Sequence, residues 1–529
     1  MAGNKGFRNL PKLARLKRGV SLPSTQRPSV SLPPRRKLPP SGETLRLEAF
    51  PPPLREFLRT LEALSRGQEI FLTGGLVRDA MLRRDEIVDA DLVTQSDAVS
   101  VARKIADAFG GACFMLDEQR GTARALLTLG ATSAQVDVAN FRASTLEADL
   151  RARDFTINAL AVELKPLIQR GRGVIVDPTG GLADLRRHRL RLCGPRSLHD
   201  DPLRALRAVR LSHQLQCSLE TRTRAAVQRA APSLGRVAWE RIRDECLMIL
   251  ALSDSAAALR DLDRLGLLRV IIPEIEAMKG TRQPAPHRFT VWEHSLRTVA
   301  SLDALLADLS LLALYSDDLA GHLREALGSA ASRAQVLKLA GLLHDVAKPE
   351  TRAEVDGRVR FIGHDTRGAE IAGDVAERLR LPTKATRTLA QLVRHHLRPM
   401  HLGQLESISR RARYRFARDL GDDAQDLLLL ALADAAAVTG ASPASVWRSP
   451  SGQLVESLLL GWKEDESTRA VPSLIHGEDV MAYFDLSPGP EVGRLLEAAH
   501  EAQALGLVST KEDALAYLQR WRGAAREIP

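Results

Sequence analysis

Residues Phe71–Thr94 read FLTGGLVRDAMLRRDEIVDADLVT, and this stretch decides the fold. Its apolar beginning predicts a short strand that stops at Gly74-Gly75, and a helical pattern opens directly behind the glycine pair. Two glycines between a strand and a helix let the backbone turn sharply and approach a ligand closely. The helix N-terminus behind them offers free N–H groups and the positive end of a dipole. The turn therefore predicts a phosphate-binding site.

Two aspartates, Asp89 and Asp91, follow this turn in a second strand-like run. Residues two apart in a strand share a face, and neighbouring carboxylates repel each other unless a cation lies between them. Mg²⁺ is the simplest such cation because it binds carboxylate and phosphate oxygens together. A glycine pair alone usually marks a turn, and a DxD alone usually marks a solvated loop, so the prediction depends on their combination.

In this order and spacing, GGLVRD followed by DADLVT resembles the signature of the class II tRNA nucleotidyltransferase and bacterial poly(A) polymerase family. The resemblance implies an α+β fold, with a polymerase-β-like nucleotidyltransferase head followed by a mostly α-helical body. It implies that Asp89 and Asp91 are catalytic and hold Mg²⁺. It also implies that Gly74, Gly75 and Arg78 bind the nucleotide.

A second family motif lies in residues 149–160, DLRARDFTINAL, which resembles RRDFTINA with alanine in place of the first arginine. The resemblance implies nucleotide contacts by Arg153, Asp154 and Asn158. Residues 174–185, VIVDPTGGLADL, match a further segment of the family, which we interpret as a structural hinge.

The run Ala134–Phe141 alternates between apolar and polar residues, as expected for a strand. Asp137 lies on its polar side and is a candidate third catalytic carboxylate beside Asp89 and Asp91. An exposed strand aspartate without a catalytic role is the alternative.

The segment DDPLRALRAVR, residues 200–210, places a charged residue at every third position. Spacing alone favours a surface helix with ion pairs between neighbours. The resemblance instead implies a base-selecting motif formed by Asp201 and Arg204, with Arg207 and Arg210 as further nucleotide-binding residues. A carboxylate accepts from the amino group of cytosine or adenine, and a guanidinium donates to the adjacent ring nitrogen. Uracil and guanine present the reverse pattern, and each buried mismatch costs roughly 1–3 kcal/mol.

Histidines and aspartates recur in a later helical region. The pattern, which includes HDVAKP, resembles the HD superfamily of metal-dependent phosphohydrolases. The resemblance implies a metal site formed by His294, His344, Asp345 and Asp434, with His364 and His395 as candidates for a second metal or a substrate phosphate. Imidazole and carboxylate ligands together suit Mn²⁺, Fe²⁺, Ni²⁺ or Zn²⁺.

The length of 529 residues predicts several domains, and the formal net charge of +10 makes a polyanionic partner plausible. The chain contains no apolar run of membrane-spanning length. Four scattered cysteines predict a reduced, cytoplasmic protein. We divide the chain into a basic disordered arm (1–45), a nucleotidyltransferase head (46–198), a helical neck (199–270), an HD domain (271–440) and a C-terminal helical region (441–529).

The basic arm carries ten Lys or Arg residues and no Asp or Glu in its first forty positions. It is compatible with an RNA-contacting arm, with an organellar transit peptide, or with a solvated tail. Because its charge equals that of the whole chain, the folded body is near neutral by count.

Three functions follow from these motifs. The first is the addition of C and/or A, from CTP and ATP, to the 3′ end of tRNA or another RNA, by attack of the RNA 3′-OH on the nucleotide α-phosphate. The second is poly(A) synthesis by the same chemistry. The third is an HD phosphohydrolase whose head only binds nucleotide, which the intact head carboxylates disfavour. The oligomeric state does not follow from the sequence.

The link between the strand ending at Phe141-Arg142 and the motif beginning at Asp149 is only six residues long. In the family, a flexible loop at this place helps the switch from C to A addition, and members that stop at CC have it shortened. Six residues span at most about 20 Å. The short link therefore predicts that the protein adds only CC. The alternative is complete CCA addition that uses a different switching element.

Overall fold

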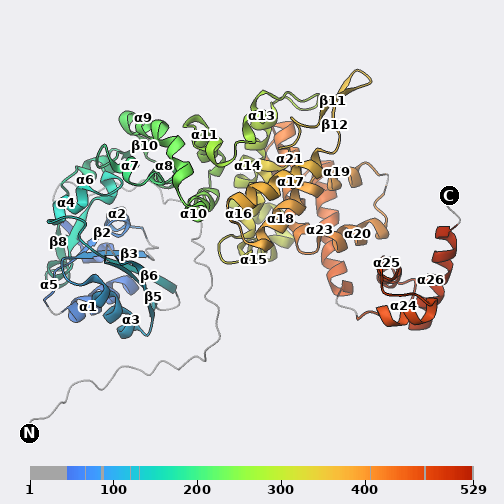
Figure 1. Ribbon diagram of the computed structural model, residues 1–529, viewed down its shortest axis with the longest axis horizontal. Helices are drawn as coiled ribbons and strands as arrows, with labels where there is room; N and C mark the ends of the chain where they lie inside the picture. Colours follow the sequence, from blue (N-terminus) through green and yellow to red (C-terminus); the bar gives the residue numbers. More distant parts are fainter. Residues whose placement is uncertain are drawn as a thin grey trace, which may run out of the picture.

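The computed structural model describes residues 44–526, apart from 66, 85–88, 119–120, 130–131, 406 and 470–471. The predicted arm, 1–45, lies outside the described residues except for its last two. Figure 1 shows an elongated molecule with a sheet at one end and helices that lead away from it to a small helical unit near the C-terminus. Within the described residues, no helix is long and apolar enough to cross a membrane.

The head is built on a mixed sheet, whose eight strands within the described residues have the order β1-β8-β7-β2-β3-β6-β5-β4. The strands are β1 (Thr44–Arg46), β2 (Ile70–Thr73), β3 (Asp89–Thr94), β4 (Ala112–Asp117), β5 (Thr122–Leu129), β6 (Thr132–Asn140), β7 (Ala161–Glu163) and β8 (Arg172–Val176). Strands β3 and β6 run parallel, whereas the other neighbours in the sheet are antiparallel. The predicted α+β organisation is confirmed.

Helices cover the sheet and enclose the core of the head. They are α1 (Pro52–Ser65), α2 (Gly75–Met81), α3 (Ala98–Phe109), α4 (Leu146–Arg151), α5 (Leu164–Gln169) and α6 (Gly181–Arg186). Helix α3 begins at Asp97, whose carboxylate accepts from two backbone N–H groups, and ends at Gly110 in the left-handed conformation. Helix α2 begins at the glycine turn, as the sequence predicts.

The neck follows as a run of short helices. They are α7 (Ser197–Asp200), α8 (Arg204–Gln214), α9 (Thr221–Ala230), α10 (Trp239–Leu250), α11 (Ser255–Arg264), α12 (Leu268–Ile271) and α13 (Ile275–Gly280), with a two-stranded sheet of β9 (Arg189–Leu190) and β10 (Ser218–Leu219).

The HD region is helical apart from one hairpin. Its elements are α14 (Val291–Ala307), α15 (Ser316–Arg324), α16 (Arg333–Leu343), β11 (Arg352–Val355), β12 (Arg358–Phe361), α17 (His364–Arg378), α18 (Thr383–His395), α19 (Arg398–Gly403), α20 (Arg410–Leu420), α21 (Asp423–Thr439), α22 (Pro443–Trp447) and α23 (Pro450–Arg469). Helix α14 packs against both α16 and α21, so three ligand-bearing segments meet at one place.

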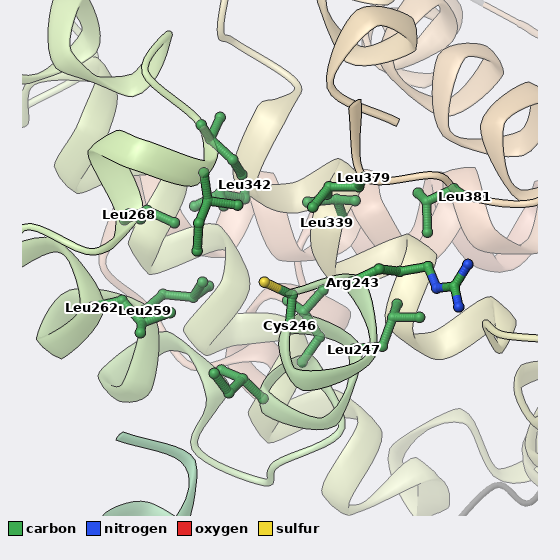
Figure 2. A pocket seen from close by; sticks show the side chains of 14 residues that line it. Arg243, Cys246, Leu247, Leu259, Leu262, Leu268, Leu339, Leu342, Leu379 and Leu381 are labelled. Carbon is green, nitrogen blue, oxygen red and sulfur yellow. The ribbon is translucent and has the colours of Figure 1, made fainter. Parts of the chain in front are cut away.

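One apolar core runs from the neck into the HD region without a break near residue 270. At this junction α10 to α12 pack against α16 and the end of α17 around a cavity of about 20 Å³, lined by leucine and isoleucine side chains and by Cys246 (Figure 2). Burial raises the pKa of the Cys246 thiol to about 12. Apolar packing of this kind joins the neck firmly to the HD region, although the predicted boundary at 270 stays a prediction.

The C-terminal helices form a separate small core. They are α24 (Gly477–Phe484), α25 (Pro490–Ala504) and α26 (Lys511–Arg526). Glu501 of α25 is buried and forms ion pairs with Arg411 and Arg415 of α20. Charged contacts therefore contribute to docking this unit on the HD region.

Candidate active site and metal centre

The glycine turn lies directly against one of the two strand carboxylates. Gly74 has φ = 67°, which favours glycine. A Cβ atom at Gly74 would lie 2.3 Å from Oδ2 of Asp91. The backbone N–H of Gly75 donates to the same carboxylate. The glycine pair and the aspartates therefore form one structural unit, and a side chain at position 74 would displace Asp91.

The carboxylates of β3 gather at one face of the sheet. Asp89 and Asp91 are partly exposed, and Ala90 between them is buried, as the alternation of a strand requires. The register of β3 with β6 puts Asp137 opposite Asp91. Burial raises the pKa of Asp91, Arg153 partly offsets this, and Asp137 raises it further. Oxygen donors that repel one another in this way are the set that a hard cation such as Mg²⁺ binds, so these residues fit the metal.

Asp137 has a partner that the sequence did not reveal. Both of its oxygens accept from Arg124 of β5, at 2.8 Å from Nε and 2.9 Å from Nη2. Arg124 lies opposite Asp137 in the antiparallel register of β5 and β6. Asp137 is therefore near the predicted carboxylates, and its catalytic role stays a prediction because Arg124 already binds it.

The predicted nucleotide-binding residues form a hydrogen-bonded chain that leads from the turn toward the neck. Arg78 donates to Asp79 and, at 2.6 Å, to Oδ1 of Asn158. Asn158 donates to Asp154 at 3.3 Å, and Asp154 in turn accepts from Arg207 of α8 at 3.3 Å. Arg78, Asn158 and Asp154 are all buried. Their hydrogen bonds with one another, and that of Asp154 with Arg207, connect the glycine turn to the neck.

Arg153 is the predicted residue that faces the turn itself. Its Nη1 would lie 3.4 Å from a Cβ atom at Gly74, and its Nε is 3.3 Å from Asp149. The Arg153 guanidinium therefore lies close to the turn and to Asp91, and its predicted contact with a triphosphate stays a prediction.

The predicted base-selecting motif lies between α7 and the first turn of α8. Oδ1 of Asp201 accepts from the backbone N–H of Leu203 at 3.2 Å, and its Oδ2 pairs with Arg241 of α10 at 2.8 Å. Arg204 donates through Nη1 to Oγ of Ser197 at 2.9 Å. Both groups of the predicted motif are therefore held by other parts of the neck.

The structure does not place Arg210 with this motif. Arg210 is buried and pairs with Glu245 at 2.7 Å, inside the neck. The reason is helical rotation, because six residues after Arg204 the helix has turned by about 600°, which is roughly 120° off the starting direction. Arg207 lies between the two directions and pairs with both Glu245 and Asp154.

The HD region brings its predicted ligands into one buried cluster. Nε2 of His294 lies 3.2 Å from Nε2 of His344 and 2.9 Å from Oδ1 of Asp434. Oδ2 of Asp345 lies 3.3 Å from His344 and 2.6 Å from Nζ of Lys348. Burial would raise the pKa of Asp345, but His344 and Lys348 hold it well below its usual range.

A second set of ligands uses His396, and the prediction of His395 was wrong by one residue. Nε2 of His364 lies 3.3 Å from Nε2 of His396, and Oδ1 of Asp345 lies 3.5 and 3.6 Å from these two atoms. Helix α18 ends at His395, which points elsewhere and is half-exposed. Asp345 thus faces the first set of ligands with one oxygen and the second set with the other.

The imidazoles are oriented as metal ligands. Three of them donate through Nδ1 to the backbone carbonyl three residues earlier: His344 to Gly341 at 3.0 Å, His364 to Phe361 at 2.6 Å and His396 to Val393 at 2.7 Å. With Nδ1 protonated, a neutral imidazole presents the lone pair of Nε2 to the cluster. Oδ1 of Asp345 is buried and accepts no hydrogen bond. Facing lone pairs and an unpartnered buried oxygen fit two divalent transition metals.

Sequence reasoning missed four residues that contact these sites: Arg124, Arg241, Glu245 and His396. Three of them contact these sites through pairings between distant segments, and sequence spacing does not show such pairings. A local signal did exist for His396, because the doublet His395-His396 ends a helical pattern. Which of the two histidines faces the cluster depends on the residue at which the helix ends.

Comparisons with known proteins match three successive parts of the chain. The family described as "Poly A polymerase head domain" matches residues 70–191. "Probable RNA and SrmB- binding site of polymerase A" matches 218–279, and "HD domain" matches 291–437.

Relatives extend over most of the chain. An A-adding tRNA nucleotidyltransferase of Deinococcus radiodurans is 38% identical over 87% of this chain and 96% of its own length. A CC-adding tRNA nucleotidyltransferase of Thermus thermophilus is 35% identical over 86% of this chain and 94% of its own length. Among solved structures, a Thermotoga maritima CCA-adding enzyme in complex with tRNA is similar in fold, with a TM-score of 0.56, 18% identity and coverage of 91% of this chain and 99% of that one.

Proposed function

We propose, from the premise that the chain belongs to the tRNA nucleotidyltransferase family built on a poly A polymerase head domain, that it adds C and/or A residues to the 3′ end of tRNA. CTP and ATP are the donors, and no nucleic-acid template is needed. The observation that carries the proposal is the contact between the glycine turn and Asp91, because it joins a phosphate-binding backbone to a metal-binding carboxylate.

The candidate residues of the head and the two residues of the neck motif each have a task in this reaction. The turn and the N–H groups that begin α2 bind the triphosphate, and Arg153 binds it from the side. Mg²⁺ held by Asp89 and Asp91 would supply charge neutralisation for attack of the RNA 3′-OH on the α-phosphate. Asp201 and Arg204 select cytosine and adenine by accepting from the amino group and donating to the ring nitrogen.

The product is proposed to be one part of the CCA end. The link after β6 consists of residues 141–145 and is tied at both ends: the N–H of Arg142 donates to Asp149 at 2.9 Å, and Thr145 caps α4. Such a link closes a turn and does not reach across the site. The relatives include an A-adding and a CC-adding enzyme, which supports CC or the terminal A as the product.

Three tRNA substrates distinguish these products, ending at the discriminator base, at the first C and at CC, each supplied with CTP and ATP together. Accumulation at CC identifies a CC-adding enzyme, and extension of only the CC-ended substrate identifies an A-adding enzyme. Efficient CCA from the first substrate would refute partial addition. Long A tails on any RNA would identify the poly(A) polymerase alternative.

A second activity is proposed for the HD region, namely hydrolysis of a phosphomonoester or cyclic phosphodiester. It is favoured by the two ligand sets that share Asp345. Mn²⁺, Ni²⁺, Fe²⁺ or Zn²⁺ suits these ligands. Asp434 is the most exposed ligand, at 29% of its side chain, so a substrate phosphate would approach from its side. Hydrolysis of a chromogenic phosphate ester and of 2′,3′-cyclic nucleotides, after loading with each metal, tests this activity.

The cytoplasmic location predicted from the cysteines belongs to the same proposal. All four cysteines are free in the structure, as a reducing compartment permits.

A further inference from the structure

A row of side chains crosses the sheet of the head, from the candidate metal site to the edge strand β4. Asp91 of β3 lies opposite Asp137 of β6. Asp137 in turn lies opposite Arg124 of β5, and Arg124 lies opposite Phe114 of β4. Directly opposed residues of neighbouring strands project from the same face of a sheet. Phe114 therefore shares the face of the candidate carboxylates, roughly 14 Å from Asp91 across three strand spacings of about 4.8 Å.

The two faces of β4 have different surroundings. Cys113 and Met115 lie opposite Ala125 and Ala123, two residues of the head core, so this face of β4 is the one that turns toward the core. Phe114 projects from the other face and is 47% exposed. An exposed aromatic ring on the face of a candidate active site offers a flat apolar surface to a substrate.

The geometry of the proposed reaction brings the RNA to this side of the metal site. The leaving pyrophosphate lies at the glycine turn, which follows β2. Strands β2 and β6 flank β3 on opposite sides. Because the attacking and leaving oxygens of phosphoryl transfer are roughly in line, we expect the RNA 3′-OH to arrive from the side away from the turn. That side carries β6, β5 and, at the edge, β4.

We infer that Phe114 holds the 3′-terminal nucleotides of the RNA by stacking on a base; this inference rests on the proposed function. Stacking on an aromatic ring tolerates any sequence because every base has a π-face. The terminal base of the RNA changes with each added nucleotide, so a sequence-tolerant contact suits this position. Along the path, Arg124 neutralises Asp137 through two hydrogen bonds, which lowers the repulsion of RNA phosphates.

The test compares Phe114→Ala with Met115→Ala, which removes a similarly exposed apolar side chain from the other face of the same strand. We expect kcat/KM for truncated tRNA to fall roughly tenfold in Phe114→Ala, because a stacking contact is lost. The KM for the nucleotide and the preference for CTP and ATP should stay unchanged, and Met115→Ala should behave like wild type. Phe114→Trp should keep the activity, whereas Phe114→Leu, which is apolar but has no ring, should lose it as Phe114→Ala does. Thermal unfolding should show that all four variants fold.

A binding measurement tests the stacking without the reaction. The fluorescence of 2-aminopurine at the 3′ terminus of truncated tRNA falls when this base stacks. We expect the fall with wild type and Met115→Ala, and a smaller one with Phe114→Ala.

The outcomes separate this inference from the proposed function. Equal kcat/KM or equal quenching in Phe114→Ala and Met115→Ala would overturn the inference and leave the proposed function intact. A changed oligomeric state of Phe114→Ala, with kcat/KM for tRNA unchanged, would instead assign the ring to a contact between copies of the chain. No addition by wild type to any truncated tRNA would overturn the proposed function, and this inference with it.

Discussion

The head and the HD region each gather carboxylates at a proposed metal site, but the two regions hold these carboxylates differently. In the head, Asp89 and Asp91 are partly exposed, and repulsion is balanced mainly by Arg153 and a backbone N–H. In the HD region, the ligands are mostly buried and the imidazoles are fixed by backbone carbonyls. We expect a fixed, buried ligand set to bind metal before substrate arrives. In the proposed reaction, the triphosphate would bring further oxygen ligands to the head site.

The largest effect should come from a substitution that inactivates only the candidate site of the head. Asp91→Asn should lower nucleotide addition by roughly 10³-fold or more, because charge that stabilises the transition state is lost. The protein should still fold, because burial already raises the pKa of the Asp91 carboxyl and therefore disfavours its charged form, which asparagine replaces with a neutral group. Primer extension on truncated tRNA and thermal unfolding check the two statements, with metal content of the HD region as the control.

Gly74→Ala should damage the same site through geometry. A methyl group 2.3 Å from Oδ2 of Asp91, at φ = 67°, must displace the carboxylate or the turn. We expect addition to fall about 100-fold or more. Gly110 also has a positive φ but has nothing within 4 Å, so Gly110→Ala controls for the loss of a positive-φ glycine without a steric contact; its ψ is 28°, whereas that of Gly74 is −139°. Equal activity of the two variants would contradict the contact.

Substitutions in the HD region should affect only the proposed metal site of that region. His344→Ala and Asp345→Asn should remove bound metal and phosphate-ester hydrolysis, and should leave nucleotide addition within about twofold, since the two sites share no residue. Metal content by mass spectrometry and both activity assays give the answer. Loss of addition in a folded variant would show that the two sites are coupled.

His396→Ala and His395→Ala sharpen the account of the HD region. Two ligand sets predict two metal ions per chain in the loaded wild type. His396→Ala should lose one of them because it removes a ligand of the second set, whereas His395→Ala should lose none. Loss of one metal ion in His395→Ala and of none in His396→Ala would instead support His395 as the ligand, as predicted from the sequence.

The smallest effect concerns the neck, away from both sites. Burial alone would lower the pKa of His213, but the hydrogen bonds that its ring donates to the carboxylates of Asp254 and Asp261 raise this pKa to about 9. Its contribution to stability is therefore complete below its unfolded pKa, near 6.5, and is lost as the pH rises through about 9. We expect a loss of about 1–3 kcal/mol over this window, which His213→Gln should reduce. Thermal unfolding at several pH values measures it.

What the sequence could predict depends on how local each feature is. The glycine turn, Asp91 and its strand lie within one short stretch, so pattern and resemblance were sufficient. The pairing of Arg124 with Asp137 requires the register of β5 with β6, and the contacts of α10 require its packing against α8. The side of a helix on which a residue lies also changes from one residue to the next. For this reason His396, and not His395, lies in the second ligand set, and Arg210 pairs with Glu245 away from the predicted motif.

We propose that the head, together with the base-selecting motif of the neck, adds C or A to tRNA and selects these bases without a nucleic-acid template. Incubation of truncated tRNA with each of the four NTPs separately, for wild type and Asp91→Asn, tests it most directly. We expect wild type to extend the tRNA with CTP or ATP only, and we expect no extension by the variant. Extension with all four nucleotides, no extension with any of them on any truncated tRNA, or undiminished extension by Asp91→Asn would contradict it.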